Sequence, residues 1–434
     1  MLSYRKLAMR VLGRPLHTGG GIDSPRPASQ RAAALILTAA MLTTLAAPAF
    51  AETWYIENGN ITVKAGDTEG TNKVSQGTII DKVDTNTIIT NQKTDKASSN
   101  TVTIETNDKN DKVEVTLKDV NIDTSSRKKA AVSVTGEGDT NIKLDGDNAL
   151  KSDIYRSGIY GSGSLTISGG ENDSLTAQGG SGANGISSSG SLTISGGTVT
   201  ANGDDGGHGI YSRGGVTISG GSTVTANGRS GTISGGDGIR SDGGVTISGG
   251  TVNATGGNGG TISGGDGIRS GGGLTVSDGT VTAKGGNGDS KDGYGGDGIR
   301  SGGVVTISGN TVNAAGGYGG KVGGYGICSF DRVAISGGTV EAAGGNGSTG
   351  GGSGIYSSVI DLSGSLELTA KAGSPNGKAL SQNGKELDLD TINKDKLDPG
   401  AKVTAINANG DSKQVSIPRP VEPEKPVIPE ESSS

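Results

Sequence analysis

Residues 237–255 read DGIRSDGGVTISGGTVNAT, and this stretch contains the three short strands from which the fold is built. Apolar side chains occupy Ile239 and every second position of segments 245–247 and 252–254. Strands with one buried face show this alternation. Glycine-containing turns separate the three segments, and glycine permits the sharp corners between them. The stretch therefore predicts one coil of three strands rather than a helix.

The same coil recurs along the chain. The dipeptide Gly-Ile marks each copy, 24 to 31 residues after the previous one. The eight copies begin at Gly158, Gly185, Gly209, Gly238, Gly267, Gly298, Gly326 and Gly354. A period in this range indicates stacked units, each too small to bury its own apolar side. We expect an all-β fold, a right-handed single-stranded parallel β-helix of about eight regular rungs with irregular caps.

The composition suits a stack of thin coils. The 434 residues include 83 glycines, and aromatic residues make up 3%. Cys328 is the only cysteine, so the fold has no intramolecular disulfide. The net charge is −6, and the acidic excess is larger beyond the basic N-terminal segment. This balance argues against nucleic acid as a partner.

The chain divides into five segments by composition. Basic residues, an apolar run at 32–47 and Ala49-Phe50-Ala51 predict a bacterial signal peptide at 1–51, cleaved after about Ala51. A membrane anchor is the alternative, but the run is shorter than the roughly 20 residues that a bilayer needs. We expect a secreted or cell-surface protein with no membrane span in the mature chain. The other predicted segments are an N-terminal cap with irregular rungs at 52–157, regular rungs at 158–372, a C-terminal cap at 373–417 and a proline-rich linker or stalk at 418–434.

Stacking turns each repeat position into a column of side chains about 4.8 Å apart. The residue after Gly-Ile should face solvent, because it follows an inward isoleucine. This column contains Tyr160, Ser187, Tyr211, Arg240, Arg269, Arg300, Cys328 and Tyr356. Guanidinium groups bind carboxylates bidentately, and tyrosine rings pack against sugar rings. We predict that an extended anionic ligand binds at Tyr160, Tyr211, Arg240, Arg269, Arg300 and Tyr356.

A second column precedes Gly-Ile and is acidic. Asp237, Asp266 and Asp297 occupy it in three consecutive rungs, and Asp204 and Asp205 lie one rung earlier. Carboxylate oxygens are typical Ca²⁺ ligands, so these five residues are candidate calcium ligands. The alternative is that the aspartates neutralise the neighbouring arginines.

Catalysis has little support in the sequence. His208 is the single histidine beyond the signal segment, and no nucleophile-elbow or zinc-protease motif is present. β-Helical lyases and glycosidases use Asp, Arg or Lys, which leaves a polysaccharide lyase or hydrolase as an alternative. The rungs are nearly uniform, however, which favours a binding surface over a catalytic cleft.

Two segments resemble a known family. The rung from Gly209 to Gly221, GIYSRGGVTISGG, and the segment DDGGHGI at 204–210 resemble the bacterial secreted carbohydrate-binding β-helix family. The resemblance covers about residues 100–370. It implies a pectate-lyase-like fold, calcium-dependent binding of acidic plant polysaccharides such as polygalacturonate, and no lyase activity. This chain departs from the family pattern, since one rung carries Asp-Asp and three carry a single Asp with Arg.

The leading hypothesis is therefore a non-catalytic, secreted or cell-surface protein that binds polysaccharide, an acidic glycan such as pectin or another plant or host glycan, with Ca²⁺ as the expected cofactor. We expect a monomer. A structural adhesin or stalk module is the second hypothesis, and a polysaccharide lyase or hydrolase is the third.

Overall fold

The structure is a computed structural model, and it describes residues 51–419. The predicted signal peptide and stalk lie outside the described residues, apart from Ala51, Pro418 and Arg419. The described part is nearly all β, with 2% helix, and it winds into a β-solenoid of about 11 turns. The predicted fold class is confirmed, with more turns than the eight that Gly-Ile marks. No helix within 51–419 is long and apolar enough to cross a bilayer.

The Gly-Ile strands form one parallel sheet. Each isoleucine lies in register with the next, as Ile239 does with Ile268 and Ile268 with Ile299. These isoleucines are fully buried, so they stack into one continuous column of the core. The strands are β12 (Ile159–Gly161), β15 (Ile186–Ser188), β18 (Ile210–Ser212), β21 (Ile239–Ser241), β23 (Ile268–Ser270), β25 (Ile299–Ser301), β28 (Ile327–Ser329) and β30 (Ile355–Ser357).

The second and third segments of each coil belong to a second sheet. Their bounds are β13 (Ser164–Ser168), β16 (Leu192–Ile194), β19 (Val216–Ile218), β26 (Val305–Ile307), β14 (Ser174–Gln178), β17 (Thr198–Asn202), β20 (Thr223–Asn227) and β27 (Thr311–Ala315). In four coils the two segments run as one bent strand: β22 (Val245–Thr255), β24 (Leu274–Lys284), β29 (Arg332–Ala343) and β31 (Val359–Lys371). Gly250, with φ +80°, lies at the bend in β22, where the pairing with β24 shifts register between Ser248 and Thr251.

A serine ends every Gly-Ile strand except β12, which ends at Gly161, and this serine closes the corner of the coil. Ser241 is buried, and its hydroxyl donates to the carbonyl oxygen of Gly214 in the preceding coil at 2.7 Å. Ser301 makes the same bond to Gly272 at 2.8 Å. A buried backbone carbonyl without a partner is costly, so the repeated serine satisfies groups that the tight corner would leave unpaired.

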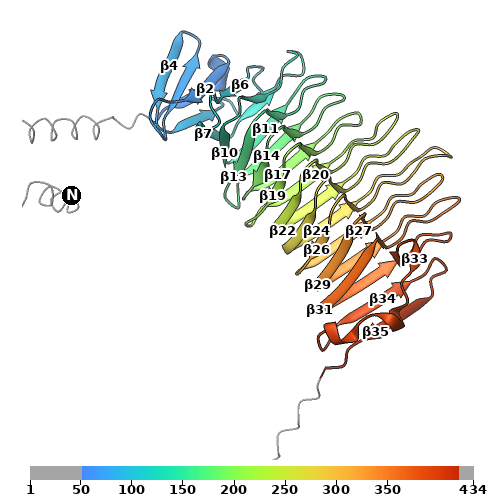
Figure 1. Cartoon of the computed structure of the whole chain (residues 1–434). Coiled ribbons are helices and arrows are strands. Elements are labelled where there is room, and N and C mark those ends of the chain that lie inside the picture. Colours follow the sequence, from blue (N-terminus) through green and yellow to red (C-terminus); the bar gives the residue numbers. More distant parts are fainter. Residues whose placement is uncertain (1–50, 420–434) are drawn as a thin grey trace, which may run out of the picture. The chain divides into compact units, whose positions relative to one another are not determined.

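Glycine-rich loops of consecutive coils lie side by side and hydrogen-bond to one another (Figure 1). The Gly236 amide donates to the Arg229 carbonyl in its own loop at 2.9 Å, and the Gly257 amide donates to the Gly236 carbonyl at 2.8 Å. This alternation continues to Gly373. A Cβ on Gly236 would lie 2.0 Å from the carbonyl oxygen of Gly207, so the close packing requires glycine. The loops are therefore a packed extension of the solenoid.

Residues before the first Gly-Ile also coil, which explains the larger number of turns. Val132 is in register with Ile159, and Val102 with Val132, although Gly-Ile is absent there. The strands are β1 (Thr53–Tyr55), β2 (Ile61–Ala65), β5 (Thr87–Thr90), β6 (Val102–Glu105), β7 (Lys112–Lys118), β8 (Asn121–Asp123), β9 (Val132–Thr135), β10 (Asp139–Asp145) and β11 (Asp147–Lys151). An antiparallel pair, β3 (Asn72–Gln76) and β4 (Ile79–Asp84), covers this end beside the 3₁₀ turn Ile56–Asn58.

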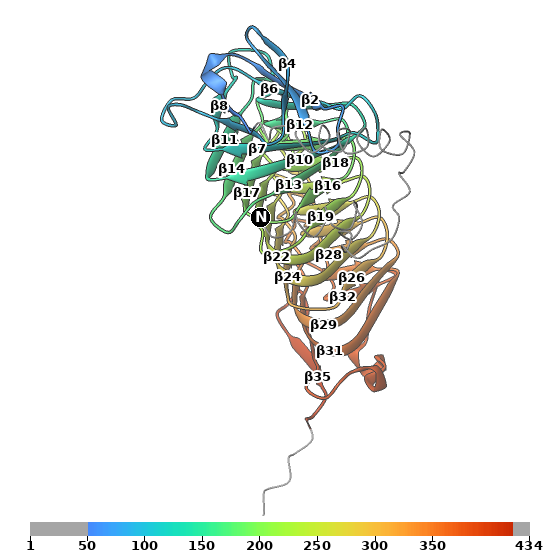
Figure 2. The ribbon, with the colours of Figure 1, turned by 90° about the vertical axis from the view of Figure 1, so that its left-hand side faces the viewer.

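The coils follow one another in chain order toward the C-terminal end (Figures 1 and 2). β32 (Leu380–Gln382) and β34 (Lys402–Ile406) add one more parallel turn. Antiparallel β33 (Lys385–Glu386) and β35 (Ser412–Ser416) then end both sheets. The 3₁₀ turns Leu389–Thr391 and Lys394–Lys396 lie between them. Residues 373–417 thus contain one further turn and its antiparallel end.

Candidate functional site

Three arginines lie in register on neighbouring strands. Arg240 pairs with Arg269, and Arg269 with Arg300, at the centres of β21, β23 and β25. The residues on either side of each arginine are buried, so alternation turns the arginine outward, as the sequence predicts. Their side chains are 35%, 44% and 37% exposed. The column places three guanidinium groups about 4.8 Å apart.

Aromatic rings flank this arginine column at both ends. The Arg240 guanidinium lies 5.9 Å from the Tyr211 ring centroid, and the Arg300 guanidinium lies 5.2 Å from that of Phe330. Tyr211 is held in place, because its hydroxyl donates to Oδ2 of Asp242 at 2.8 Å. Arg269 has no ring partner among the described residues and is the most exposed of the three. It is therefore the arginine most available to a ligand.

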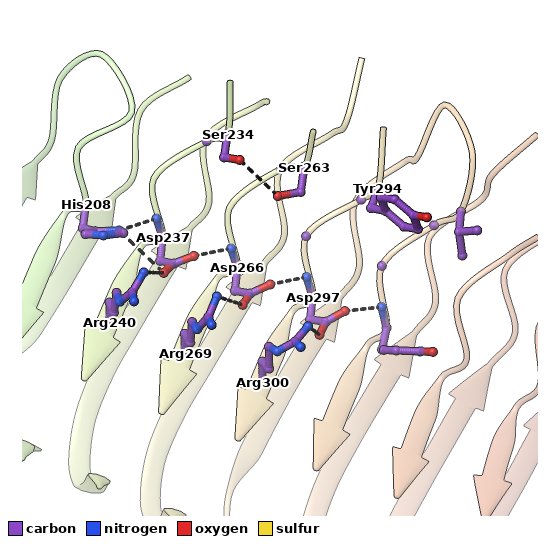
Figure 3. A pocket seen from close by; sticks show the side chains of 18 residues that line it. His208, Ser234, Asp237, Arg240, Ser263, Asp266, Arg269, Tyr294, Asp297 and Arg300 are labelled. Carbon is purple, nitrogen blue, oxygen red and sulfur yellow. Dashed lines mark hydrogen bonds and ion pairs between the residues drawn. The ribbon is translucent and has the colours of Figure 1, made fainter. Parts of the chain in front are cut away.

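The three aspartates form a buried ladder beneath the arginines (Figure 3). Oδ1 of Asp237 accepts the amide N–H of Asp266, and Oδ1 of Asp266 accepts that of Asp297, both at 2.7 Å. Oδ1 of Asp297 accepts the amide of Tyr325 at 2.7 Å. One carboxylate oxygen per coil thus connects that coil to the next. The aspartates are structural links between coils, a role that the sequence did not indicate.

The second oxygen of each aspartate faces the arginine three residues later. The Nη1–Oδ2 distances are 3.8 Å for Arg240 and Asp237, 3.9 Å for Arg269 and Asp266, and 3.3 Å for Arg300 and Asp297. Only Arg300 donates a hydrogen bond to its aspartate, and the other two pairs are longer, so the structure gives the alternative of neutralisation by neighbouring charges partial support. Oδ2 of Asp237 is buried without a hydrogen bond.

Burial raises the pKa of all three aspartates. It raises the pKa of Asp266 to about 7, with the charge of Asp237 as the second cause, and that of Asp297 to about 8, with the charge of Asp266 second. Burial also raises the pKa of Asp237. The nearby guanidinium groups act in the opposite direction and do not outweigh burial. The ladder uses only Oδ1, so a proton on Oδ2 leaves it intact.

His208 continues the ladder on the N-terminal side. Its Nδ1 accepts the amide N–H of Asp237 at 2.7 Å, and its own amide donates to Oδ1 of Asn184 at 2.9 Å. Nδ1 therefore carries no proton, and the 3.6 Å approach to Oδ2 of Asp237 is not an ion pair. Burial, followed by the charges of Arg240 and Arg269, lowers the pKa of His208 to about 4. The imidazole is neutral at physiological pH.

The five predicted calcium ligands do not fit a calcium site. Each ladder carboxylate uses Oδ1 on an amide and turns Oδ2 toward a guanidinium, where a second cation would be repelled. Asp205 is exposed in another loop, and its Oδ2 accepts the Ser181 hydroxyl at 3.3 Å. Asp204 lines a different hollow with Asp123. Within residues 51–419, no three His, Cys, Asp or Glu side chains converge as metal ligands do.

A groove of about 450 Å³ is lined by residues of five successive coils, beside the arginines. The arginine column forms one wall, and the aspartates and His208 line the floor (Figure 3). Ser234, Ser263, Tyr294 and Val322 line the opposite wall, on the glycine-rich loops. These four were missed from the sequence, although each lies four residues before the glycine of its Gly-Ile pair. Tyr294 is 45% exposed and presents an aromatic ring to the groove.

The other residues that follow Gly-Ile differ in exposure and in their distance from the groove. Tyr160 is 43% exposed but lies outside this groove, three coils before Arg240. Tyr356 stacks on Tyr325 at 4.9 Å between ring centroids, and Tyr325 lines the C-terminal end of the groove. Ser187 and Cys328 are buried rather than exposed, because longer side chains flank each in the column. Burial also raises the pKa of the Cys328 thiol, so it is not a reactive thiolate.

The three arginines in register can hold a chain of negative charges. Comparison with known proteins agrees with a binding role. A family model described as "Carbohydrate-binding domain-containing protein" matches residues 94–352, more than half of the chain. This match includes the groove and all three arginines. No curated protein and no solved structure matched the chain.

Proposed function

Because the chain belongs to the family of carbohydrate-binding domain-containing proteins, we propose that the arginine groove binds an acidic polysaccharide along the solenoid axis, without cleaving it. The observation that carries the proposal is the register of Arg240, Arg269 and Arg300. A ligand that repeats one carboxylate per sugar matches a site that repeats one guanidinium per coil. Uronic acid polymers, of which pectin is one, have this chemistry.

The groove supplies the two kinds of contact that such a ligand needs. Guanidinium groups bind carboxylates through paired N–H donors, and an exposed ring packs against the apolar face of a sugar. Arg269 and Tyr294 supply these contacts from opposite walls. Backbone groups of the glycine loops lie beside them. The groove is built by the packing of successive coils, so little ordering of the protein opposes binding.

The groove gathers three arginines although the protein as a whole is acidic. Burial raises the pKa of Asp266 and Asp297 and so favours their neutral forms, which lowers the compensation of the arginine charges. An anionic ligand therefore meets a local cationic strip on a chain of net charge −6. This arrangement favours acidic over neutral glycans. An extracellular location, which the N-terminal signal segment predicts, would bring the protein to such polymers.

Titration calorimetry with a matched pair of ligands tests the proposal. The two probes are de-esterified and fully methyl-esterified homogalacturonan, which share a backbone and differ in carboxylate charge. We expect binding of the first and at least about tenfold weaker binding of the second, since loss of one charged contact costs about 1.5–3 kcal/mol. Equal affinity for the two, or no binding of either, would exclude this function.

Two further measurements test whether binding depends on calcium and whether the protein cleaves its ligand. Since the aspartates do not fit calcium, the affinity should stay the same with calcium or with a chelator. A chelator-dependent loss would instead support the calcium dependence that the family resemblance implies. Incubation should release no unsaturated or reducing ends, and release of either would indicate a lyase or a hydrolase.

A further inference from the structure

A second hollow, of about 570 Å³, lies toward the N-terminal end of the same face. Lys128, Lys129, Arg156, Tyr155 and Tyr160 are among its lining residues, and none of its lining residues is acidic. The three cationic side chains are exposed. None of them takes part in an ion pair within residues 51–419. The hollow thus gathers free positive charge on an acidic protein.

Asp153 holds the two loops that carry these cations. It is buried, and its Oδ2 accepts the amide N–H of Lys128 at 2.6 Å while its Oδ1 accepts that of Ile154 at 2.7 Å. The carboxylate is therefore engaged with backbone amides. The Arg156 amide also donates to the Asp153 carbonyl at 2.9 Å. The cations are positioned by a fixed buried link, and their charged ends remain available.

Two exposed tyrosine rings accompany the cations. Tyr155 is 78% exposed, and its ring lies so close over Gly182 that a Cβ there would be 3.0 Å from ring carbons Cδ1 and Cε1. The Tyr155 amide donates to the Ser181 carbonyl at 2.9 Å. Tyr160 is 43% exposed. Supported aromatic rings beside unpaired cations match a sugar that carries an acidic group.

The hollow lies in line with the arginine groove along the repeat register. Tyr160 pairs with Ser187, Ser187 with Tyr211, and Tyr211 with Arg240. Asn184 lines the hollow, and it accepts the amide of His208, which lines the groove. From Tyr160 to Arg300 the column spans five coil steps, or about 24 Å. One extended chain can contact both places.

We infer that the basic hollow is a second subsite for the same acidic polysaccharide, so that one chain occupies the hollow and the arginine groove together. This inference rests on the proposed function. Two linked contacts on one ligand raise the overall affinity well above that of either contact alone. Short fragments should bind at one subsite only, and longer chains should gain affinity once they reach both.

The test compares Lys128→Gln/Lys129→Gln/Arg156→Gln with a control of nearly equal charge change, Lys371→Gln/Lys385→Gln/Lys394→Gln, which alters exposed lysines far along the solenoid. The probes are trigalacturonate and polygalacturonate, measured by calorimetry. All substituted side chains are exposed, and circular dichroism checks that both variants fold. We expect the first variant to lose at least about tenfold in affinity for polygalacturonate. Its affinity for trigalacturonate should change little, and the control should keep both affinities.

The outcomes separate this inference from the proposed function. If the first variant binds polygalacturonate as tightly as the control, the second subsite is refuted, while wild-type binding of polygalacturonate still supports the groove. If it loses trigalacturonate and polygalacturonate equally, the linked-subsite inference is also refuted. If the wild-type protein binds neither probe, the proposed function fails and the inference fails with it.

Discussion

Replacement of Asp266 by asparagine should make the protein more stable at pH 8 and leave it nearly unchanged at pH 4. Asparagine keeps the Oδ1 that accepts the Asp297 amide, so the ladder is preserved. It also places an N–H donor where the protonated acid has its O–H. The variant thus mimics the neutral carboxyl and removes only the ability to ionise.

Repulsion by a neighbouring carboxylate, attraction to arginine and the cost of burial together decide whether Asp266 ionises in the folded protein. The carboxylate of Asp237 lies one coil away, about 4.8 Å, and at an effective dielectric constant of about 20 it repels the Asp266 carboxylate by about 3 kcal/mol when ionised. Arg269, at 3.9 Å, attracts it by about 4 kcal/mol on the same scale. Burial adds a desolvation cost of several kcal/mol. Repulsion and burial together exceed the attraction.

The sign of the pH dependence follows from the raised pKa. The unfolded chain ionises this carboxyl near pH 3.8 and the folded protein near 7. Between these values the folded state binds the extra proton, so the free energy of unfolding falls as the pH rises. The difference corresponds to roughly 4 kcal/mol by pH 8. Asparagine should recover a large part of this loss.

Guanidinium chloride unfolding followed by circular dichroism from pH 4 to pH 8.5 measures the effect. Asp289→Asn, at an exposed loop position, is the control. The wild type and the control should lose stability across the range, and Asp266→Asn should lose markedly less. A wild-type stability that rises with pH, or an equal slope for Asp266→Asn, would show that the arginines keep the ladder ionised.

Three further predictions follow from the groove and the loops. Arg269→Gln should weaken binding of de-esterified homogalacturonan about tenfold or more in calorimetry, whereas exposed Arg213→Gln should not. Wild-type affinity for this ligand should decrease from pH 6 to pH 9, because ionising aspartates compensate the arginines; an affinity that rises would contradict the raised pKa of Asp266. Gly265→Ala should destabilise by several kcal/mol in thermal unfolding, because its Cβ would lie 2.0 Å from the Gly236 carbonyl oxygen, while Gly221→Ala, with open space around it, should be nearly neutral.

The periodicity of the chain made the coils and the outward arginines predictable. Ile239 and Ser241 flank Arg240, and strict alternation of a strand leaves one direction for the arginine. The same argument failed for Ser187 and Cys328, because alternation gives the direction of a side chain and not the length of its neighbours. Val132 occupies the isoleucine position after Ala131 rather than after glycine, within the segment 52–157 where irregular rungs were expected.

Other parts of the site depended on contacts between coils that no single repeat reveals. The burial of Asp266 arises where the coil turns a corner, outside the alternation of any strand. Tyr294 reaches the groove because the glycine loops pack against each other in register. The sequence shows that Tyr294 lies four residues before Gly298. Only the folded loop shows that this position lines the groove. The loop wall of the groove therefore could not be predicted from the columns of residues beside Gly-Ile.

A crystal structure with a bound oligogalacturonate tests the central claim most directly. We expect sugars along the groove, with carboxylates within hydrogen-bonding distance of Arg240, Arg269 and Arg300 and one sugar ring against Tyr294. The aspartate ladder should keep its Oδ1 contacts, with no metal ion beside it. Sugar bound on another face while the groove stays empty, or held by a calcium ion on the aspartates, would contradict the proposed role of the arginine groove.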